Sequence, residues 1–298
     1  MARTVHTSLL MIGGAEDKLG RATILRRFVR LAGGRNARIV VIPTASSFPE
    51  QAIETYTTIF RRLGAPEVVA VDPPSRPAAA GVAIVQAIDN ATGVFITGGN
   101  QLKLSQLFLG TPLAEAITRA HARGAVVAGT SAGASIMSRF MISLGRDGVT
   151  PRQRGGQLTS GLGLLPDVIV DQHFDQRARY GRLMALVAGS PNLLGMGIDE
   201  DTAAEIRDGR TLTVVGSGAV FVVDARNAVS DVPEARRDAP LLVSGAVVHL
   251  LPTGATFDLN TAQLTGFVEK HPDVVVKAAA TMVDDSADAG RPAPRRTH

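Results

Sequence analysis

The stretch Ala125-Val126-Val127-Ala128-Gly129-Thr130-Ser131-Ala132-Gly133-Ala134-Ser135 predicts a buried strand, a tight turn and the start of a helix. Its apolar run ends at a Gly-x-Ser-x-Gly pentapeptide, which places Ser131 at the apex of the turn. A nucleophile on so sharp a turn brings its neighbours close together, so the flanking residues have to be small. The amide of Ala132 then points at whatever the Ser131 hydroxyl attacks, near the positive end of a helix. An ordinary small-residue turn that packs a helix on a sheet is the alternative.

Alternating strands and helices surround this stretch. Apolar runs predict buried strands at residues 8–12, 37–42, 68–71, 93–97 and 125–128. Helical patterns separate them at about 21–32, 49–63 and 81–88, in a segment that ends near 109, and at 112–123; Ser47 is a candidate cap for the second. This alternation indicates right-handed βαβ units, so we predict an α/β fold with a mostly parallel central sheet and helices on both faces. Reactive groups gather beyond the carboxyl ends of such strands.

The composition limits the kind of protein. The chain has 298 residues, 45% of them hydrophobic, but only 4% aromatic, which predicts a sizeable aliphatic core. A net charge of +4, dispersed along the chain, does not favour nucleic acid as a partner. The chain contains no cysteine, which excludes disulfides, thiolate metal sites and a cysteine nucleophile. No apolar run suits a signal peptide or a membrane span, so we expect a cytoplasmic protein without a membrane partner.

The second half of the chain changes character. Residues 141–165 are rich in glycine and arginine and predict a long loop or a hairpin over the site. A strand at 167–170, a helix at about 175–188 and the end of another strand at 197–203 follow. From about 204 to 258 the pattern is β. We predict one α/β domain over residues 1–283, with a β-rich extension at about 204–258 and a disordered tail at 284–298.

A serine nucleophile needs a base, and the base needs a group that orients it. Among six histidines, His173 alone lies just after a buried strand. The orienting acid is expected at the next strand end, which carries Asp199, Glu200 and Asp201. Earlier acids that spacing leaves open are Asp147, Asp167 and Asp171. An acid after the histidine departs from the serine, acid, histidine order of the α/β-hydrolases and argues against that fold.

Two backbone amides are candidates for an oxyanion hole. One belongs to Ala132, and the other to Gly99, because Gly98-Gly99 ends another predicted strand. A simple lead-in to the next helix is the alternative for this glycine pair. Loss of one oxyanion donor typically lowers turnover by about 10²–10³.

Arginines cluster after the candidate base, in Asp171-Gln172-His173-Phe174-Asp175-Gln176-Arg177-Ala178-Arg179-Tyr180-Gly181-Arg182. On a regular helix Arg179 and Arg182 share a face, whereas Arg177 points elsewhere. The guanidinium fork matches two carboxylate oxygens, so the group favours an acidic substrate. A solvated basic helix face is the alternative.

Four motifs resemble those of the cyanophycinases, in the serine peptidase family that also holds the α-aspartyl dipeptidases. They are Gly13-Gly14-Ala15-Glu16-Asp17-Lys18, Thr97-Gly98-Gly99-Asn100-Gln101, Gly129-Thr130-Ser131-Ala132-Gly133-Ala134 and Asp171-Gln172-His173-Phe174. The resemblance spans about residues 9–258 and implies a flavodoxin-like fold similar to class I glutamine amidotransferases, usually as a homodimer. It departs at Asn100, where aspartate is expected.

This resemblance implies a function and a set of roles. The substrate would be cyanophycin, a poly-aspartate backbone with arginine on each side-chain carboxyl, cleaved as an exopeptidase to β-Asp-Arg dipeptides. Family roles transfer as nucleophile Ser131, base His173 and acid Glu200. The matching substrate-pocket positions are Gln101, Asp171, Gln172, Arg177, Arg179 and Arg182. In that pocket arginines would hold the substrate carboxylates, and Asp171 a guanidinium. No metal or organic cofactor is implied.

Two other functions compete with this one. A related serine peptidase would act on small aspartyl or isoaspartyl dipeptides, but the long β-rich portion after Thr202 favours the polymer. A catalytically idle binding protein or amidotransferase-like scaffold is the third reading, which the joint presence of Ser131, His173 and Glu200 disfavours.

Overall fold

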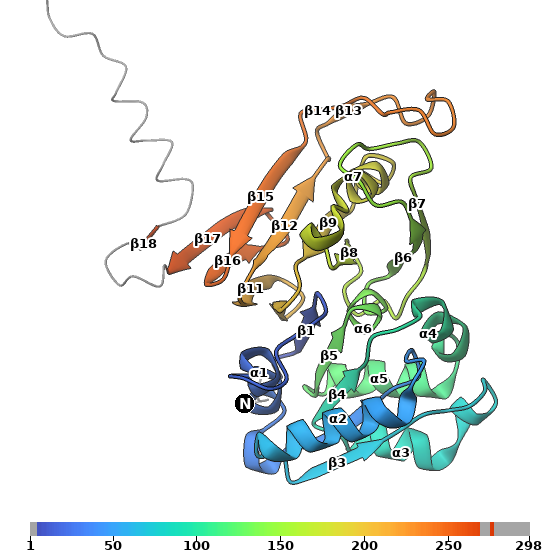
Figure 1. The fold of residues 1–298 in the computed structure, drawn as a ribbon, viewed down its shortest axis with the longest axis vertical. Coiled ribbons are helices and arrows are strands. Elements are labelled where there is room, and N and C mark those ends of the chain that lie inside the picture. The colour runs from blue at the N-terminus through green and yellow to red at the C-terminus, as the bar shows by residue number, and fades with distance from the viewer. Residues whose placement is uncertain (1–4, 269–274, 277–298) are drawn as a thin grey trace, which may run out of the picture.

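A computed structural model describes residues 5–268 and 275–276 of the chain (Figure 1). The predicted tail at 284–298 lies outside these residues. Helices and strands alternate along the first half of the chain, and the later strands extend away from the helical layers (Figure 1). This arrangement confirms the predicted α/β fold with added C-terminal strands.

The main sheet of the described chain has ten strands in the order β18-β17-β16-β11-β10-β1-β5-β4-β2-β3. Their bounds are β1 Ser8–Ile12, β2 Arg38–Ile42, β3 Glu67–Ala70, β4 Gly93–Ile96, β5 Val126–Thr130, β10 Thr202–Arg207, β11 Thr211–Gly216, β16 Ala255–Asp258, β17 Gln263–Val268 and β18 Val275–Val276. Strands β1, β5, β4, β2 and β3 pair in parallel, as the βαβ pattern predicts. Strand β10 pairs antiparallel with β1 and begins the added β portion. The carboxyl ends of the parallel strands therefore lie along one edge.

A second, smaller sheet carries the segments after the nucleophile. It runs β15-β12-β9-β8, and β8 and β9 are parallel. The bounds are β8 Val168–Gln172, β9 Leu194–Ile198, β12 Ala219–Asp224 and β15 Val247–Pro252. The arginine-rich stretch predicted as a loop or hairpin is a hairpin of β6 Phe140–Gly145 and β7 Gly156–Ser160. A short pair, β13 Val229–Ser230 and β14 Val243–Ser244, follows β12.

Helices cover both faces of the main sheet. The α-helices are α1 Thr23–Leu31, α2 Pro49–Arg62, α3 Val82–Asn90, α4 Gln101–Phe108, α5 Pro112–Ala122, α6 Ala132–Ser135 and α7 Tyr180–Ala188. Short 3-10 turns lie at η1 Gly34–Asn36, η2 Ala78–Ala80 and η3 Asp175–Arg177. No helix in the described ranges has both the length and the apolar character needed to cross a bilayer.

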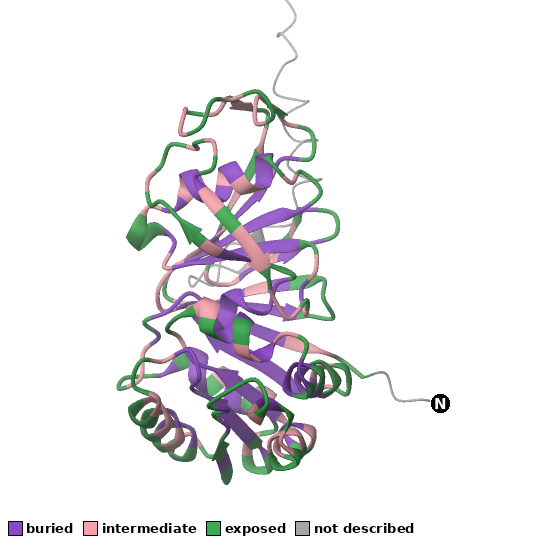
Figure 2. Ribbon diagram, turned by 90° about the vertical axis from the view of Figure 1, so that its right-hand side faces the viewer, coloured by how far each residue is buried: buried purple, intermediate pink, exposed green. Residues whose placement is uncertain are grey.

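Successive residues of β1 point into two separate cores, because side chains alternate across a strand. Leu9 and Met11 join the core under α3, α4 and α5, while Leu10 and Ile12 join the core under α1 and α2. Figure 2 shows the central strands of the main sheet buried and the outer faces of the helices exposed. The second core is less aliphatic than predicted. Its aromatic rings touch, with centroids 4.6–5.8 Å apart; they belong to Phe28, Tyr56, Phe60 and Phe95.

Two local predictions are wrong. Helix α2 begins after Phe48, whose side chain makes no cap, and Ser46 rather than Ser47 accepts the amide of Phe48. The predicted helix at 175–188 is interrupted, because Ala178 has a φ of 48° and separates η3 from α7. Arg179 is consequently the N-cap residue of α7 rather than part of a continuous helix face.

Candidate active site

Ser131 lies at the junction of β5 and α6, where the pentapeptide predicts it. Its backbone is strained, with φ 53° and ψ −113°, and strain of this kind clusters at functional sites. Close packing requires the flanking glycines. A Cβ at Gly129 would lie 2.2 Å from the carbonyl oxygen of Gly133, and one at Gly133 would lie 2.1 Å from that of Ile96. The turn therefore has no room for a side chain at residue 129 or residue 133.

The side chains of Ser131, His173 and Glu200 form one line of hydrogen bonds. Nε2 of His173 lies 3.0 Å from Oγ of Ser131, and its Nδ1 lies 2.6 Å from Oε1 of Glu200. The His173 side chain is 15% exposed, against 36% for that of Glu200. The three residues follow β5, β8 and β9, so the two sheets meet at this point. The arrangement has the geometry in which a carboxylate orients an imidazole toward a hydroxyl.

The neighbouring acids are engaged elsewhere. Asp199 accepts hydrogen bonds from the amides of Asp175 and Ala219, at 3.2 and 3.1 Å. Asp201 accepts the amide of Asp17 at 2.8 Å. These two carboxylates fix loops around the site, and Glu200 between them reaches the imidazole.

The loop after β1 holds the three segments together. Carbonyl groups of residues 12–14 accept hydrogen bonds from the amides of Ser131, His173 and Asp201, at 2.9, 2.8 and 2.8 Å. Gly14 has a φ of +109°, and a Cβ there would lie 2.2 Å from Cε1 of His173. The imidazole thus packs directly on this glycine. Sequence reasoning did not predict this contact, although a glycine pair directly after a buried strand was the available signal.

Burial lowers the pKa of His173 below its usual 6.5. The hydrogen bond to Glu200 opposes this shift, and the positive charges of Arg177 and Arg179 add to it. The imidazole is consequently neutral at pH 7 and able to accept a proton from the hydroxyl 3.0 Å away.

Both amides predicted for an oxyanion hole are free of protein acceptors. Among the described residues, neither the amide of Gly99 nor that of Ala132 donates a hydrogen bond. Gly99 has a φ of +140° and sits so close to Ala45 that a Cβ would lie 2.0 Å from its carbonyl oxygen. The adjacent Gly98 packs on Ser131, since a Cβ there would lie 3.2 Å from the serine Cβ.

The structure places three of the predicted pocket residues in a buried ion-pair network. The guanidinium of Arg182 forks onto Asp171, with Nε and Nη2 2.6 and 2.5 Å from the two oxygens. Asp171 is 1% exposed and Arg182 6%. Arginines of the protein thus occupy the carboxylate of Asp171, for which the family resemblance implies a substrate guanidinium instead.

Arg179 extends this network to the nucleophile. Its Nη1 donates to the backbone and side-chain oxygens of Gln172, at 2.6 and 3.1 Å, and its Nε to Asp147 at 3.1 Å. The same Gln172 side-chain oxygen lies 3.4 Å from Oγ of Ser131. Arg179 thus orients an amide that contacts the serine hydroxyl.

The remaining pocket residues differ in freedom. The Gln101 side-chain amide donates to the carbonyl of Ile142, at 2.5 Å, and links α4 to the hairpin. Arg177 is exposed and has no ion-pair partner in the described part of the chain. It is the predicted arginine best placed to meet a ligand.

A carboxylate missed by the sequence reasoning lies beside the nucleophile. Glu16 is 3% exposed, and its oxygens accept hydrogen bonds from Tyr56 at 2.5 Å and Thr130 at 2.6 Å. Lys18 lies 2.7 Å from the same carboxylate. Glu16 and Lys18 belong to the motif at residues 13–18, to which the sequence analysis assigned a family resemblance but no role for either side chain.

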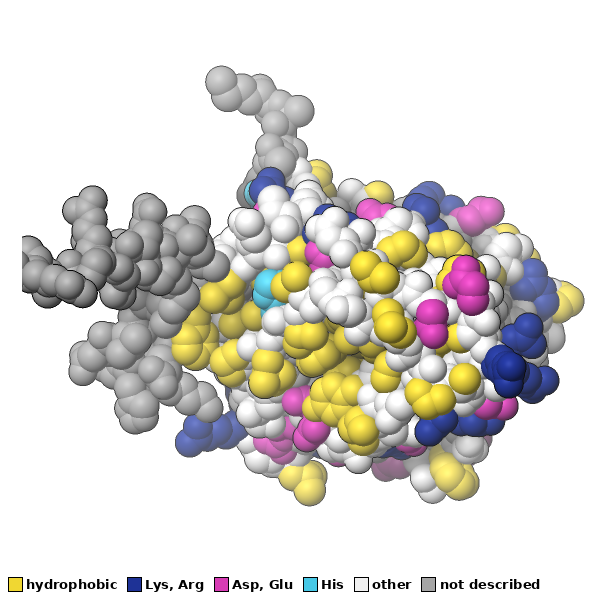
Figure 3. All heavy atoms as spheres, turned by 90° about the horizontal axis from the view of Figure 1, so that it is seen from above, with side chains coloured by type: hydrophobic (Ala, Val, Ile, Leu, Met, Phe, Trp, Pro, Cys, Tyr) yellow, Lys and Arg dark blue, Asp and Glu magenta, His cyan; other side chains and the backbone are white. Residues whose placement is uncertain are grey.

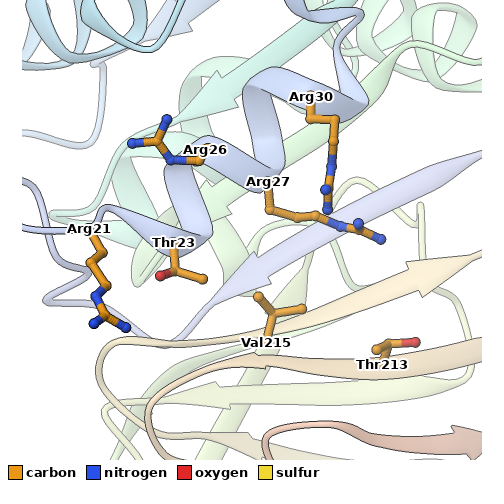
Figure 4. Close-up of a pocket in the computed structure, with 7 residues that line it drawn as sticks. All are labelled: Arg21, Thr23, Arg26, Arg27, Arg30, Thr213 and Val215. Carbon is orange, nitrogen blue, oxygen red and sulfur yellow. The ribbon is translucent and has the colours of Figure 1, made fainter.

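Ser131 opens into a cavity of about 260 Å³, shared with Gly14, Glu16, Lys18, Ser46 and Gly98. A larger cavity of about 640 Å³ lies between α1 and β11, and Figure 4 shows arginines on and just before the helix, and Thr213 and Val215 on the strand. That cavity has no histidine, serine or carboxylate in its lining, so the smaller one is the candidate active site. No group of three or more potential metal ligands occurs among the described residues.

Comparison with known proteins identifies relatives of the chain. Residues 9–214 match the model of peptidase family S51. The cyanophycinase of Nostoc sp. is 41% identical over 260 residues, which cover 86% of this chain and 87% of that protein. The cyanophycinase of Geminocystis herdmanii is 37% identical over 272 residues, covering 90% of this chain and 100% of that protein.

Two solved structures share the fold. A peptidase from an acI-B1 Actinobacterium aligns with a TM-score of 0.58 and 23% identity, over 82% of this chain and 97% of that one. A putative peptidase E protein from Listeria monocytogenes aligns with a TM-score of 0.50 and 19% identity, over 71% and 99%.

Proposed function

This chain belongs to peptidase family S51, and we propose that it hydrolyses cyanophycin to β-Asp-Arg dipeptides through an acyl-enzyme on Ser131. The observation that carries the proposal is the 37–41% identity to cyanophycinases over 86–90% of the chain. The family makes the protein a serine peptidase. The line from Ser131 through His173 to Glu200 supports the assignment of the individual roles.

In the acylation step, Oγ of Ser131 attacks the scissile carbonyl carbon while its proton passes to Nε2 of His173. Nδ1–H of His173 donates to Glu200, which stabilises the imidazolium that forms. The carbonyl oxygen becomes negative and accepts hydrogen bonds from the amides of Gly99 and Ala132. The imidazolium then gives its proton to the leaving nitrogen, and the C-terminal product departs.

Water completes the cycle by the same chemistry. His173 accepts a proton from the water as its oxygen attacks the ester carbon. Collapse of the second tetrahedral intermediate returns a proton to Oγ of Ser131 and releases the acid product. Nε2 of His173, which lies 3.0 Å from Oγ in the free protein, thus accepts or donates the proton in every step, and the mechanism needs no cofactor.

Substrate recognition is assigned to two kinds of residue. Exposed Arg177 is suited to a substrate carboxylate, because it has no competing ion pair within the described ranges. The wall of the pocket near the β6–β7 hairpin is shaped by hydrogen bonds, from Gln101 to the backbone of that hairpin and from Arg179 to Gln172. Asp171 and Arg182 support that wall from the buried side.

The test compares polymer and dipeptide hydrolysis. Purified wild type, Ser131→Ala and the exposed-serine control Ser75→Ala are incubated with insoluble cyanophycin and with α-Asp and β-Asp dipeptides. We expect wild type and Ser75→Ala to clear the polymer and Ser131→Ala to leave it. Cleavage of dipeptides alone would favour the small-peptide alternative, and equal silence from all three proteins would leave a binding scaffold.

We extend the proposal to a cytoplasmic homodimer. Exposed apolar side chains on β15 support a protein contact; they are Val247, Val248 and Leu250, at 52%, 48% and 67% exposure. Figure 3 shows apolar side chains spread over the end of the molecule that carries the later strands. Light scattering of the purified protein and fractionation of its host cell test the two parts separately; a monomer in the first would remove the dimer.

A further inference from the structure

The cavity at Ser131 has a second charged wall, which comes from the N-terminal part of the chain rather than from the arginine-rich segment at 171–182. Lys18, Ser46 and Tyr56 line it together with the nucleophile. None of these residues has a part in the triad or in the predicted substrate pocket. The wall comes from the loop after β1 and from the start of the α2 region, so it is independent of the β8–α7 segment that carries Arg177 and Arg179.

The buried carboxylate of Glu16 holds the side chain of Lys18 in place. This carboxylate is 1% exposed, and Nζ of Lys18 lies 2.7 Å from Oε1. Tyr56 also donates to Oε1, and Thr130 donates to Oε2. Burial, followed by the charge of Glu16, raises the pKa of Tyr56, so the phenol stays protonated as a donor. Three protein donors thus engage this buried carboxylate, two at Oε1 and one at Oε2, so its charge is balanced within the protein.

Lys18 keeps donor capacity for a ligand. An ammonium has three protons, and Lys18 uses two of them, one on the Glu16 carboxylate at 2.7 Å and one, weakly, on the Glu16 carbonyl at 3.3 Å. Its side chain is 32% exposed. Ser46 accepts the amide of Phe48, and among the described residues its hydroxyl proton has no protein acceptor. Two donors, one of them charged, therefore face the cavity that contains Ser131.

The backbone that carries Lys18 is fixed before any ligand arrives. The Asp17 carboxylate accepts the amides of Leu19, Gly20 and Ala22 at 2.7–3.0 Å, and the Asp17 amide donates to Asp201. A guanidinium nitrogen of Arg62 donates to the carbonyl of Lys18 at 2.6 Å. Binding at this lysine costs little ordering of the loop, as expected of a preorganised site.

We infer that Lys18, assisted by the Ser46 hydroxyl, binds a carboxylate of the substrate next to the scissile bond. This inference rests on the proposed function. A cyanophycin chain offers two carboxylate sources: the α-carboxylate of its terminal aspartate and the α-carboxylate of each attached arginine. If Lys18 reads the terminal one, it gives the site its preference for cleavage at a chain end.

The experiment combines one variant with three substrates. Wild type, Lys18→Met and Arg35→Met are assayed on a three-unit β-Asp-Arg segment, on the same segment with its terminal carboxylate amidated, and on one with its arginine carboxylates amidated. Arg35 is exposed in η1, away from the cavity lining, so its substitution removes one positive charge as a matched control.

We expect Lys18→Met to raise KM about 10- to 100-fold on the parent segment, the loss that follows removal of one hydrogen bond to a charged group. Its kcat and the kinetics of Arg35→Met should change by less than about threefold. On the one amidated segment that lacks the recognised carboxylate, wild type and Lys18→Met should have equal KM. The segment on which they converge identifies the source.

Three results overturn the inference. Equal KM for wild type and Lys18→Met on the parent segment removes the contact, and an undiminished difference on both amidated segments makes Lys18 structural only. A wild type that does not cleave the parent segment refutes the proposed function and this inference with it. If Lys18→Met does not fold, Lys18→Gln, which keeps a donor toward Glu16, serves in the same comparison.

Discussion

Gly14→Ala is the substitution that tests most directly how the site is held. In the wild type a Cβ at residue 14 would lie 2.2 Å from Cε1 and 2.6 Å from Nε2 of His173. Ordinary van der Waals contact begins at 3.4 Å, so the imidazole has to move by more than about 1 Å. Such a shift breaks the 3.0 Å contact with Ser131 or the 2.6 Å contact with Glu200. We expect kcat to fall by about 10²-fold, the usual effect of a 1 Å misplacement.

Gly33→Ala is the matched control. Gly33 has the same φ of +109°, but its nearest neighbour to a new Cβ is a backbone atom 3.6 Å away. Both alanines carry the backbone strain of a positive φ, about 1–2 kcal/mol. The two variants should therefore lose similar thermal stability, while Gly14→Ala alone loses activity.

Two measurements decide the comparison. Initial rates of β-Asp-Arg release give kcat, and labelling by a serine-directed fluorophosphonate gives the reactivity of residue 131 directly. A Gly14→Ala protein with rates within threefold of Gly33→Ala would refute the claim that the imidazole rests on this glycine. A larger loss of melting temperature in Gly14→Ala would instead show that the loop, rather than the base, absorbs the clash.

Three further substitutions separate catalysis, proton affinity and stability. Arg177→Ala removes a positive charge that lowers the pKa of His173. The acid limb of the pH profile of kcat/KM, which lies below pH 6.5 in wild type, should therefore move to higher pH. An acid limb at the wild-type position contradicts this prediction. Glu200→Gln should lower kcat by about 10³–10⁴ with KM little changed, as steady-state kinetics will show, and a loss under tenfold would make another group the orienting acid. Arg182→Ala leaves Asp171 buried without its forked partner and should lower the free energy of unfolding, measured by chemical denaturation, by about 3–5 kcal/mol. A variant as stable as wild type would mean that solvent reaches the carboxylate.

Local chemistry made the parallel half of the fold predictable. Each apolar run in residues 8–130 is followed within two residues by glycine or proline and then by a helical pattern, and the observed strands match within about two residues. The Gly-x-Ser-x-Gly turn was predictable for the same reason, since the glycines answer a steric demand within the motif. For the hairpin at 140–160 the sequence left a loop and a hairpin equally open, because its glycines and arginines favour neither structure.

Long-range pairing was beyond the sequence pattern. Nothing local shows that β8 and β9 leave the main sheet for a second one, or that β10 pairs with β1 across more than 190 residues. The break at Ala178 was hidden because residues 175–188 have a continuous helical composition. The enclosure of Asp171 was beyond prediction for a related reason: spacing reveals a carboxylate, but only the fold reveals the two arginines that enclose it.

The order serine, histidine, acid follows from the strand register rather than from any one residue. Strands β8 and β9 are parallel neighbours with Gln172 opposite Ile198, so His173 and the 199–201 stretch leave adjacent strand ends together. Ser131 leaves a different sheet, and the carbonyls of residues 12–14 span the gap between them. A side chain at residue 14 would enter the imidazole itself. The loop after β1 therefore sets the distance between nucleophile and base, and the same loop, four residues later, places Lys18 in the cavity.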